Sequence, residues 1–149
     1  MKILMCRPDY YGVEYEINPW MNINHQVDHQ TAIKQWEGLY QTIQDCGTTV
    51  ELVPPVSGWP DMVFTANAGL PYQNNIILAH FKHKERQGEV PYFKTWFQQA
   101  GFHIINHEDN TPFFEGAGDA LFAGDILFAG FGFRTDQKFY EQAKDLDDE

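Results

Sequence analysis

Two acidic residues, Glu115 and Asp119, lie close together in the stretch FFEGAGDALF. Gly116, Ala117 and Gly118 separate them, and apolar or aromatic residues flank the group on both sides. Carboxylates held among glycines at the entrance to a strand favour a role in binding a cation or moving a proton. The stretch therefore predicts a functional site.

Three further stretches carry polar side chains at expected strand ends or loops, where binding residues often gather. INPW contains Asn18, PDMVFTAN contains Asp61 and Asn67, and GFRT contains Arg134. Carboxylate and amide oxygens suit a guanidinium group, which has five N–H donors in one plane. An arginine side chain in turn suits a ligand carboxylate. Together the four stretches predict a site for a small zwitterion such as arginine.

Each of these residues also has a purely structural explanation. Asn18 and Asp61 both lie next to a proline, where their side chains could start turns. Asp119 could accept hydrogen bonds from loop amides, and Arg134 could cap a helix or pair with Asp136. The functional interpretation gains weight because the four stretches occupy equivalent ends of repeated segments.

The sequence offers little support for a metal or a cofactor. The six histidines form three close pairs: His25 and His29, His80 and His83, His103 and His107. The first pair has a spacing suited to zinc on a helix, but no HExxH pattern or third ligand accompanies it. GAGD matches no phosphate-binding loop, and its acidic neighbours would repel a phosphate. We expect surface or hydrogen-bonding histidines, no metal and no cofactor.

Composition and charge limit the class of protein. The chain has 149 residues, 43% of them hydrophobic, which predicts one folded domain with a core. Its formal net charge of −11 disfavours nucleic acid, and no apolar run is long enough to span a membrane. The opening MKILMCRPDY does not resemble a signal peptide. We interpret Cys6 and Cys46 as reduced thiols packed as small apolar residues in a cytoplasmic protein.

Apolar periodicity and turn residues predict alternating strands and helices. Helices are expected over residues 29–46, 90–100 and 135 to about 146. Strands are expected over residues 2–6, 48–53, 74–81 and 102–106, with a short one inside 60–69 and two inside 119–133. A turn is expected near residues 71–75.

The order is strand–helix, followed twice by strand–strand–strand–helix. Gly47 and Gly101 each end a helix that is followed by a strand, a loop and a paired-strand segment. We interpret this order as an internal structural repeat in an α/β protein, with about two and a half units. Such an array leaves one edge uncovered, which favours self-association or a partner.

Long motifs in the chain resemble one known family. LMCRPDYYGVEYEINPWM, GWPDMVFTANAGL, HKERQGEVPYFKTWF and FEGAGDALF followed by GFGFRT resemble the N-terminal half of the arginine dihydrolase group. That group belongs to the guanidino-group-modifying enzymes, with arginine deiminase, dimethylarginine dimethylaminohydrolase and the amidinotransferases. The resemblance covers essentially the whole chain. It implies a pentein-type α/β propeller of ββαβ units, of which residues 1–149 form a single partial domain without the C-terminal units.

The resemblance also implies roles for particular residues. It implies catalytic Glu115 and the substrate-binding residues Asn18, Asp61, Phe64, Asn67, Asp119 and Arg134. Asp61 and Asn67 would bind the guanidino nitrogens, and Arg134 would hold the α-carboxylate. Asp119 would support its loop or touch the substrate. EGAGD is one residue longer than the EGGD of many relatives. Because of this extra residue, Glu115 aligns less directly with the family's acidic residue than Asn67 aligns with its own counterpart.

In the family, a cysteine thiolate attacks the guanidinium carbon, ammonia leaves, and a histidine helps water to release the covalent intermediate. The dihydrolase version yields ornithine, carbon dioxide and ammonia. Both residues belong to the C-terminal half of the family domain, which these 149 residues do not include, and neither Cys6 nor Cys46 matches the nucleophile's motif. We therefore expect no turnover of arginine by the chain alone, since loss of a nucleophile typically costs about 10⁴-fold or more in rate.

Three functions remain compatible with the sequence. The chain could be the N-terminal portion of a hydrolase that a half bearing the cysteine and the histidine completes. It could bind arginine or a related guanidine, such as agmatine or a methylated arginine, without converting it. It could also be a structural oligomer with a vestigial site. A homo-oligomer or a complementary chain is expected in each case.

Overall fold

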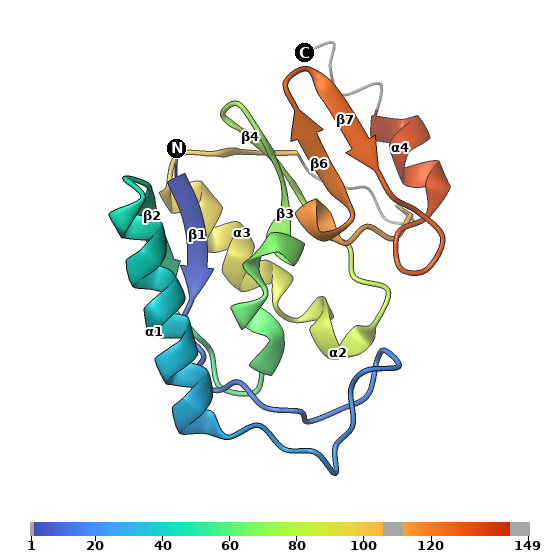
Figure 1. Ribbon diagram of the computed structural model, residues 1–149. Coiled ribbons are helices and arrows are strands. Elements are labelled where there is room, and N and C mark those ends of the chain that lie inside the picture. Colours follow the sequence, from blue (N-terminus) through green and yellow to red (C-terminus); the bar gives the residue numbers. More distant parts are fainter. Residues whose placement is uncertain (1, 106–111, 144–149) are drawn as a thin grey trace. The chain divides into compact units, whose positions relative to one another are not determined.

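The computed structural model describes residues 2–105 and 112–143, in which strands and helices alternate (Figure 1). The strands are β1 (Lys2–Cys6), β2 (Thr49–Val53), β3 (Gly69–Tyr72), β4 (Asn75–Leu78), β5 (His103–Ile105), β6 (Ala120–Ala123) and β7 (Ile126–Ala129). The α-helices are α1 (His29–Asp45), α2 (Lys84–Gln87), α3 (Val90–Gln99) and α4 (Gln137–Ala143). Short 3₁₀ helices are η1 (Pro60–Val63), η2 (Thr65–Ala68) and η3 (Gly116–Gly118). The predicted α/β class is confirmed.

The chain divides into two compact units, Met1–Thr65 and Ala66–Glu149. In the first unit, β1 and β2 pair in parallel and α1 connects them. The carboxylate of Asp28 caps α1 by accepting a hydrogen bond from the Thr31 N–H at 2.7 Å. Gly47, with φ of 78°, follows the helix in the left-handed conformation that its position in the sequence predicts.

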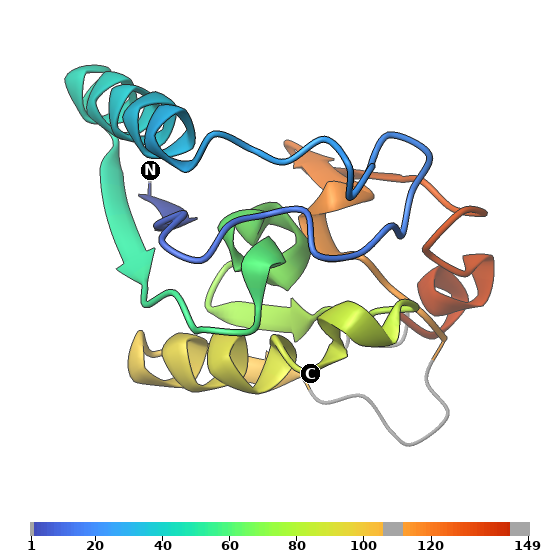
Figure 2. The same cartoon turned by 90° about the horizontal axis from the view of Figure 1, so that it is seen from below.

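The second unit contains a three-stranded sheet in the order β3–β4–β5. β3 and β4 form an antiparallel hairpin, and β4 pairs in parallel with β5 after the connection through α3. α3 packs against β4 and β5 (Figure 2). β6 and β7 form a second hairpin, after which α4 begins. A hairpin followed by a helix therefore occurs twice in this unit.

Aromatic packing fixes the segment that leads into the acidic pair. Leu70, Phe114, Ala120 and Phe139 form a buried cluster, in which the rings of Phe114 and Phe139 stack with centroids 3.9 Å apart. The backbones of His80 and Phe114 exchange two hydrogen bonds of 2.9 Å. The backbone just before Glu115 is therefore fixed by the hydrogen bonds to His80 and by the packing of the Phe114 ring.

Most of the predicted elements are present, with several differences. The turn expected near residues 71–75 is shorter, because β3 extends to Tyr72 and β4 begins at Asn75. Residues 60–69 do not contain a strand before Gly69, because Pro60 has no N–H and the segment forms η1 and η2 instead. α2 was not predicted, since four residues are too few for a periodic pattern. α4 begins at Gln137 rather than at residue 135, and residues 144–146 and 106 of the predicted elements lie outside the described residues.

Candidate functional site

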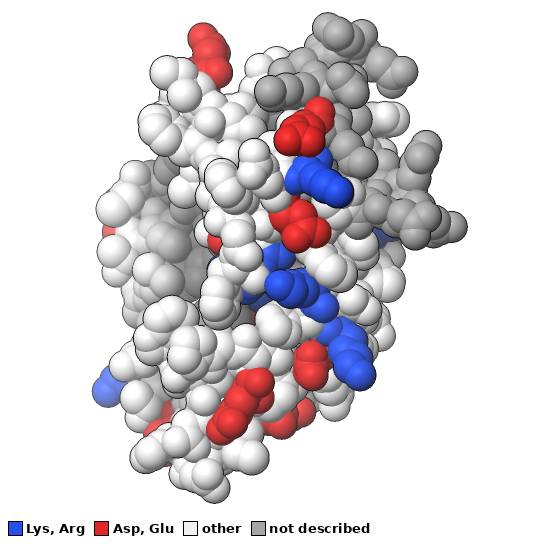
Figure 3. All heavy atoms as spheres, turned by 90° about the vertical axis from the view of Figure 1, so that its right-hand side faces the viewer, with Lys and Arg blue, Asp and Glu red and all other residues white. Residues whose placement is uncertain are grey.

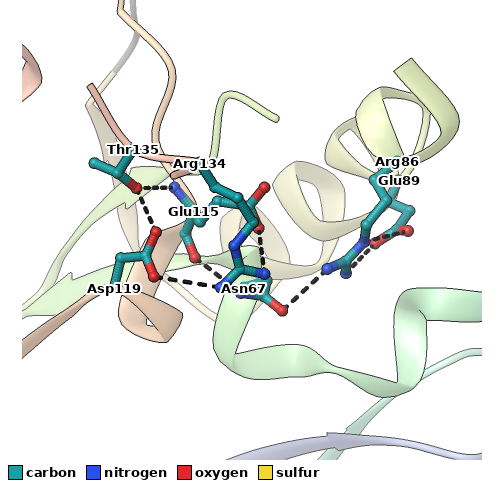
Figure 4. Close-up of polar contacts among 7 residues, drawn as sticks. All are labelled: Asn67, Arg86, Glu89, Glu115, Asp119, Arg134 and Thr135. Atoms are coloured by element: carbon teal, nitrogen blue, oxygen red, sulfur yellow. Dashed lines mark hydrogen bonds and ion pairs between the residues drawn. The ribbon is translucent and has the colours of Figure 1, made fainter. Parts of the chain in front are cut away.

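Four of the seven predicted site residues lie together in the second unit. Asn67, Glu115, Asp119 and Arg134 form one cluster of polar contacts, with Arg86, Glu89 and Thr135 as further members (Figure 4). Asn67 comes from η2, Glu115 and Asp119 flank η3, and Arg134 follows the β6–β7 hairpin. The turns at the ends of strands thus bring together residues that are far apart in the sequence.

Two glycines allow the acidic loop to approach Asn67. Gly116 has φ of 65°, and an added Cβ there would lie 2.8 Å from the Gly69 backbone nitrogen. A Cβ at Gly118 would collide with Nδ2 of Asn67. This Nδ2 donates a hydrogen bond to the backbone carbonyl of Glu115 at 3.1 Å. The spacing of EGAGD is therefore required by a close approach of backbone and side chain.

A buried arginine holds the other end of the Asn67 amide. Arg86 Nη1 donates to Asn67 Oδ1 at 3.0 Å. The same guanidinium donates to both oxygens of Glu89, at 2.9 and 2.8 Å, and lies 4.5 Å from the centroid of the Phe81 ring. This two-pronged pair is largely removed from water. Asn67 is consequently fixed at both of its polar atoms.

The hydroxyl of Thr135 connects the two acidic residues. It accepts a hydrogen bond from the Glu115 N–H at 3.1 Å and donates one to Asp119 Oδ2 at 2.7 Å. Because a hydroxyl has a single proton, the bond to Asp119 fixes the direction of this small network. The Thr135 side chain thereby links the Asp119 carboxylate to the Glu115 backbone.

Arg134 contacts both carboxylates of the EGAGD stretch. Its Nη2 lies 3.3 Å from Asp119 Oδ1, and its Nη1 lies 3.6 Å from Glu115 Oε2. Asp136, the partner considered for Arg134 from the sequence, instead accepts a hydrogen bond from the Phe113 N–H at 3.0 Å. The described contacts therefore connect Arg134 to the acidic pair.

Glu115 is the electrostatically unusual member of the cluster. Only 1% of its surface is exposed, and no described donor makes a hydrogen bond with its Oε2. Burial raises the pKa of the Glu115 carboxyl group, as does the charge of Asp119 to a smaller degree, while the charges of Arg134 and Arg86 oppose the rise. The site thus combines one well-bonded carboxylate, that of Asp119, with a desolvated carboxyl group that can accept additional donors.

The other three predicted residues belong to the first unit. Asn18 Oδ1 accepts hydrogen bonds from the backbone N–H groups of Trp20 and Met21, at 3.0 and 3.1 Å, so that Asn18 forms the turn considered from the sequence. Phe64 is half-exposed and its ring meets that of Tyr11 edge-on at 5.7 Å.

Asp61 is buried within η1 of the first unit. Its charge contributes to a raised pKa of the Tyr11 hydroxyl, for which burial of Tyr11 is the larger cause. The Asp61 carboxylate therefore interacts electrostatically with the Tyr11 hydroxyl.

The histidines and cysteines do not form a metal site in the described part of the chain. No group of three His, Cys, Asp or Glu side chains there could hold a metal ion. His29 Nε2 lies 2.8 Å from the carbonyl of Pro8. Cys6 is buried as expected, whereas Cys46 is exposed because it follows the last turn of α1 at the surface.

One face of the molecule carries charges of both signs. The face drawn in Figure 3 shows acidic and basic side chains side by side. This face is unlike the continuous basic patch that a nucleic-acid backbone requires. Among residues 2–105 and 112–143, no helix is both long and apolar enough to cross a membrane.

Comparison with known proteins identifies the family. The family model described as N,N dimethylarginine dimethylhydrolase, eukaryotic, matches residues 12–147. The chain belongs to this family, within the guanidino-group-modifying superfamily that its motifs resemble.

Individual relatives are closely similar. The chain is 55% identical over 139 residues to the bifunctional arginine dihydrolase/ornithine cyclodeaminase ArgZ of Synechocystis sp., covering 91% of this chain and 19% of ArgZ. It is 40% identical over 138 residues to the N(G),N(G)-dimethylarginine dimethylaminohydrolase of Mycobacterium tuberculosis, covering 93% and 45% of the two chains. A mutant N-terminal domain of ArgZ, solved with its substrate bound, has a TM-score of 0.90 and 51% identity, covering 98% of this chain and 55% of that domain.

The aligned fractions show which part of the relatives corresponds to this chain. It matches the N-terminal domain of ArgZ, an arginine dihydrolase, and spans about half the length of that domain. The fold is shared more widely, since a dimethylarginine dimethylaminohydrolase structure with 21% identity has a TM-score of 0.74.

Three members of the cluster were missed from the sequence: Arg86, Glu89 and Thr135. Arg86 and Glu89 have the i, i+3 spacing of a helical ion pair inside HKERQGEV, which is a usable signal. Thr135 directly follows Arg134 in GFRT, where its hydroxyl was overlooked beside the charged residue.

Proposed function

We propose that the chain supplies the guanidinium-binding part of an arginine dihydrolase-type site. The observation that carries this proposal is the buried Glu115 carboxyl group, which has an oxygen without a described hydrogen bond and lies 3.6 Å from a guanidinium nitrogen of Arg134. Carboxylate oxygens in a desolvated setting favour a cation with several fixed donors. The similarity to the substrate-bound ArgZ domain supports arginine as that ligand.

Each member of the cluster has a proposed role. Glu115 would face the guanidinium and act as the acidic partner in catalysis, and Asn67 would contribute its amide oxygen. Asp119 would support Glu115 and meet the ligand at its edge. The resemblance assigns Asn18, Asp61 and Phe64 of the first unit to the same ligand, and these assignments remain predictions.

The proposed chemistry needs groups from outside residues 1–149. A thiolate would attack the guanidinium carbon, a terminal C–N bond would break as ammonia leaves with an added proton, and water would then cleave the C–S bond and return the thiolate. A second hydrolysis of the resulting ureido group would release ornithine, ammonia and carbon dioxide. Cys6 is buried at the end of β1 and Cys46 lies at the end of α1, so neither is proposed as that nucleophile. The cysteine and the histidine would come from a complementary half of the family domain.

Assembly with further ββαβ units is part of the proposal. Leu121, Ile126 and Phe128 are each more than 60% exposed, and the strand register places them on one face of the β6–β7 hairpin. We propose that the remaining blades of an α/β propeller, or a second copy of this chain, cover this face. The setting we propose is cytoplasmic, as for other enzymes of small metabolites.

Recognition of the guanidinium is tested by comparing L-arginine with L-citrulline, which replaces the charged guanidinium with a neutral ureido group. Binding to the 149-residue chain can be followed by tryptophan fluorescence or by NMR chemical shifts. We expect saturable binding of arginine and binding of citrulline that is at least about tenfold weaker, as loss of a charged hydrogen-bonding partner predicts. Equal affinities would show that Glu115, Asn67 and Asp119 do not recognise the guanidinium.

A further inference from the structure

A cavity of about 150 Å³ lies within the second unit, between its two hairpins and α4. The wall formed by the three-stranded sheet consists of Leu70, Tyr72, Asn75, Ile77 and Ile105. The strand register places these five side chains on one face, because paired positions and positions two apart along a strand point to the same side. The cavity therefore follows from the pleat of the sheet.

The opposite wall comes from the β6–β7 hairpin and α4. Phe122 and Leu127 are paired in register, so that both point away from the exposed apolar face of this hairpin. Phe139 and Tyr140 of α4 complete the lining together with Asp125 of the hairpin turn. An apolar cavity of this size can hold a molecule as large as benzene.

The helix wall of the cavity is fixed in the absence of a ligand. The Phe139 ring stacks on that of Phe114 with centroids 3.9 Å apart, and Phe139 is only 2% exposed. The Tyr140 hydroxyl donates a hydrogen bond to the Gly130 carbonyl at 2.8 Å. A ligand would therefore enter a space that is already formed, which lowers the entropic cost of binding.

Two polar side chains at the cavity have unused hydrogen-bonding capacity. The carboxylate of Asp125 and the side-chain amide of Asn75 make no hydrogen bond or ion pair with residues 2–105 and 112–143. The rings of Tyr72 and Phe122, in the same lining, have centroids 4.8 Å apart. A carboxylate and aromatic rings both attract a cation, and the net charge of −11 adds to this attraction.

We propose that this cavity binds a small organic cation, namely a primary ammonium group on an aromatic body about the size of a benzene ring. The apolar body fills the cavity, and the ammonium group pairs with Asp125 and donates to the amide oxygen of Asn75. None of the lining residues belongs to the polar cluster around Glu115. The inference is therefore independent of the proposed function.

The test is an NMR chemical-shift titration of the 149-residue chain with benzylamine and with benzyl alcohol, which has a similar shape and no charge. We expect saturable shifts of the lining residues and an affinity for benzylamine that is at least about fivefold higher. Asp125→Asn removes the charge and keeps a residue suited to the turn. It should abolish this preference and leave the affinity for benzyl alcohol unchanged.

Two further variants control the test. Glu141→Gln removes an exposed carboxylate from α4 of the same unit, and the preference for benzylamine should persist in it. Leu127→Trp adds volume on the hairpin wall and should abolish saturable binding of both ligands. The dispersion of the amide signals shows whether this larger change leaves the fold intact.

The inference is wrong if wild type shows no saturable binding of benzylamine, or if benzylamine shifts residues other than those of the lining. Equal affinities for the two ligands in wild type would overturn the assignment of a cation. An equal loss of preference in Asp125→Asn and Glu141→Gln would show that net charge alone attracts benzylamine, which also contradicts the site. Each of these results leaves the binding of arginine at the Glu115 cluster untouched.

Discussion

At the scale of single residues, the Thr135 hydroxyl is central to the geometry of the site. Its two hydrogen bonds join the Glu115 backbone to the Asp119 carboxylate, and Thr135 itself is only 1% exposed. The Glu115 N–H is buried, so that it cannot replace this hydrogen bond with one to water without a cost in free energy. This buried hydroxyl therefore fixes the position of the Asp119 carboxylate relative to the Glu115 backbone.

Replacing Thr135 with valine keeps the side-chain volume but removes both hydrogen bonds. We expect the free energy of unfolding to fall by about 1–3 kcal/mol, because a buried N–H and a carboxylate oxygen lose their partner. Urea denaturation measures this change. Thr135→Ser retains the hydroxyl and should recover most of the loss; equal destabilisation by valine and serine would mean that packing of the methyl group, not the hydroxyl, matters.

The protonation of Glu115 should make stability depend on pH. Burial raises the pKa of this carboxyl group above its ordinary value of 4.5. The unfolded chain then loses the proton at a lower pH than the folded chain, so the free energy of unfolding falls as the pH rises from about 4.5 through the raised pKa. The size of the effect is about 1.4 kcal/mol for each unit by which the pKa is raised.

Glu115→Gln cannot ionise, so its stability relative to wild type should increase with pH over this range. Urea denaturation at several pH values from 4 to 8 measures the difference. Glu141→Gln, an exposed carboxyl group on α4, should follow the wild-type pH dependence. Parallel curves for wild type and Glu115→Gln would contradict the raised pKa.

At the scale of elements, the sequence predicts the hairpins and long helices better than the turns that build the site. Gly47, Gly101 and the apolar periodicity mark α1 and α3, and Gly124–Asp125 marks the β6–β7 turn. The residues around Asp61 and Asn67 form 3₁₀ turns whose shape depends on packing rather than on periodicity.

The candidate site was likewise only partly predictable. Asn67, Glu115 and Asp119 stand out because polar residues are unexpected among their apolar neighbours. The Arg86–Glu89 pair has a helical spacing that usually belongs to a solvent-exposed pair. Its burial comes from contacts with Phe81 and Asn67, which lie on other segments, and no local pattern specifies such contacts.

The EGAGD loop lies in close contact with the Asn67 side chain at Gly118. Gly118→Ala would place a methyl group against the Asn67 side-chain amide, although the backbone conformation itself suits alanine. We expect a loss of about 1–3 kcal/mol in the free energy of unfolding and a large loss of arginine affinity. Urea denaturation and calorimetry measure the two effects.

Gly38 provides the matched control for this substitution. It lies inside α1 with nothing within 4 Å of an added Cβ, so that Gly38→Ala should stabilise the chain by about 1 kcal/mol. If Gly118→Ala were as well tolerated as Gly38→Ala, the close contact with Asn67 would not be a requirement of the site.

At the scale of the whole molecule, the exposed hairpin face should direct assembly. Ile126 and Phe128 are each 63% exposed on β7, where an apolar surface favours association. We expect wild type to self-associate and Ile126→Lys/Phe128→Lys to be monomeric, as measured by light scattering after gel filtration. Tyr92→Lys, an exposed aromatic position on α3, should keep the wild-type mass. An unchanged mass in the double variant would exclude this face as the interface between copies.

The most direct test of the account is a calorimetric titration of the 149-residue chain with L-arginine, with released ammonia assayed in the same samples. The account predicts saturable heat and no ammonia, because the acidic cluster recognises the guanidinium and the proposed nucleophile lies outside these residues. Ammonia released by the chain alone would contradict the assignment of the chemistry to a complementary half. Absence of any binding heat would contradict the guanidinium site itself.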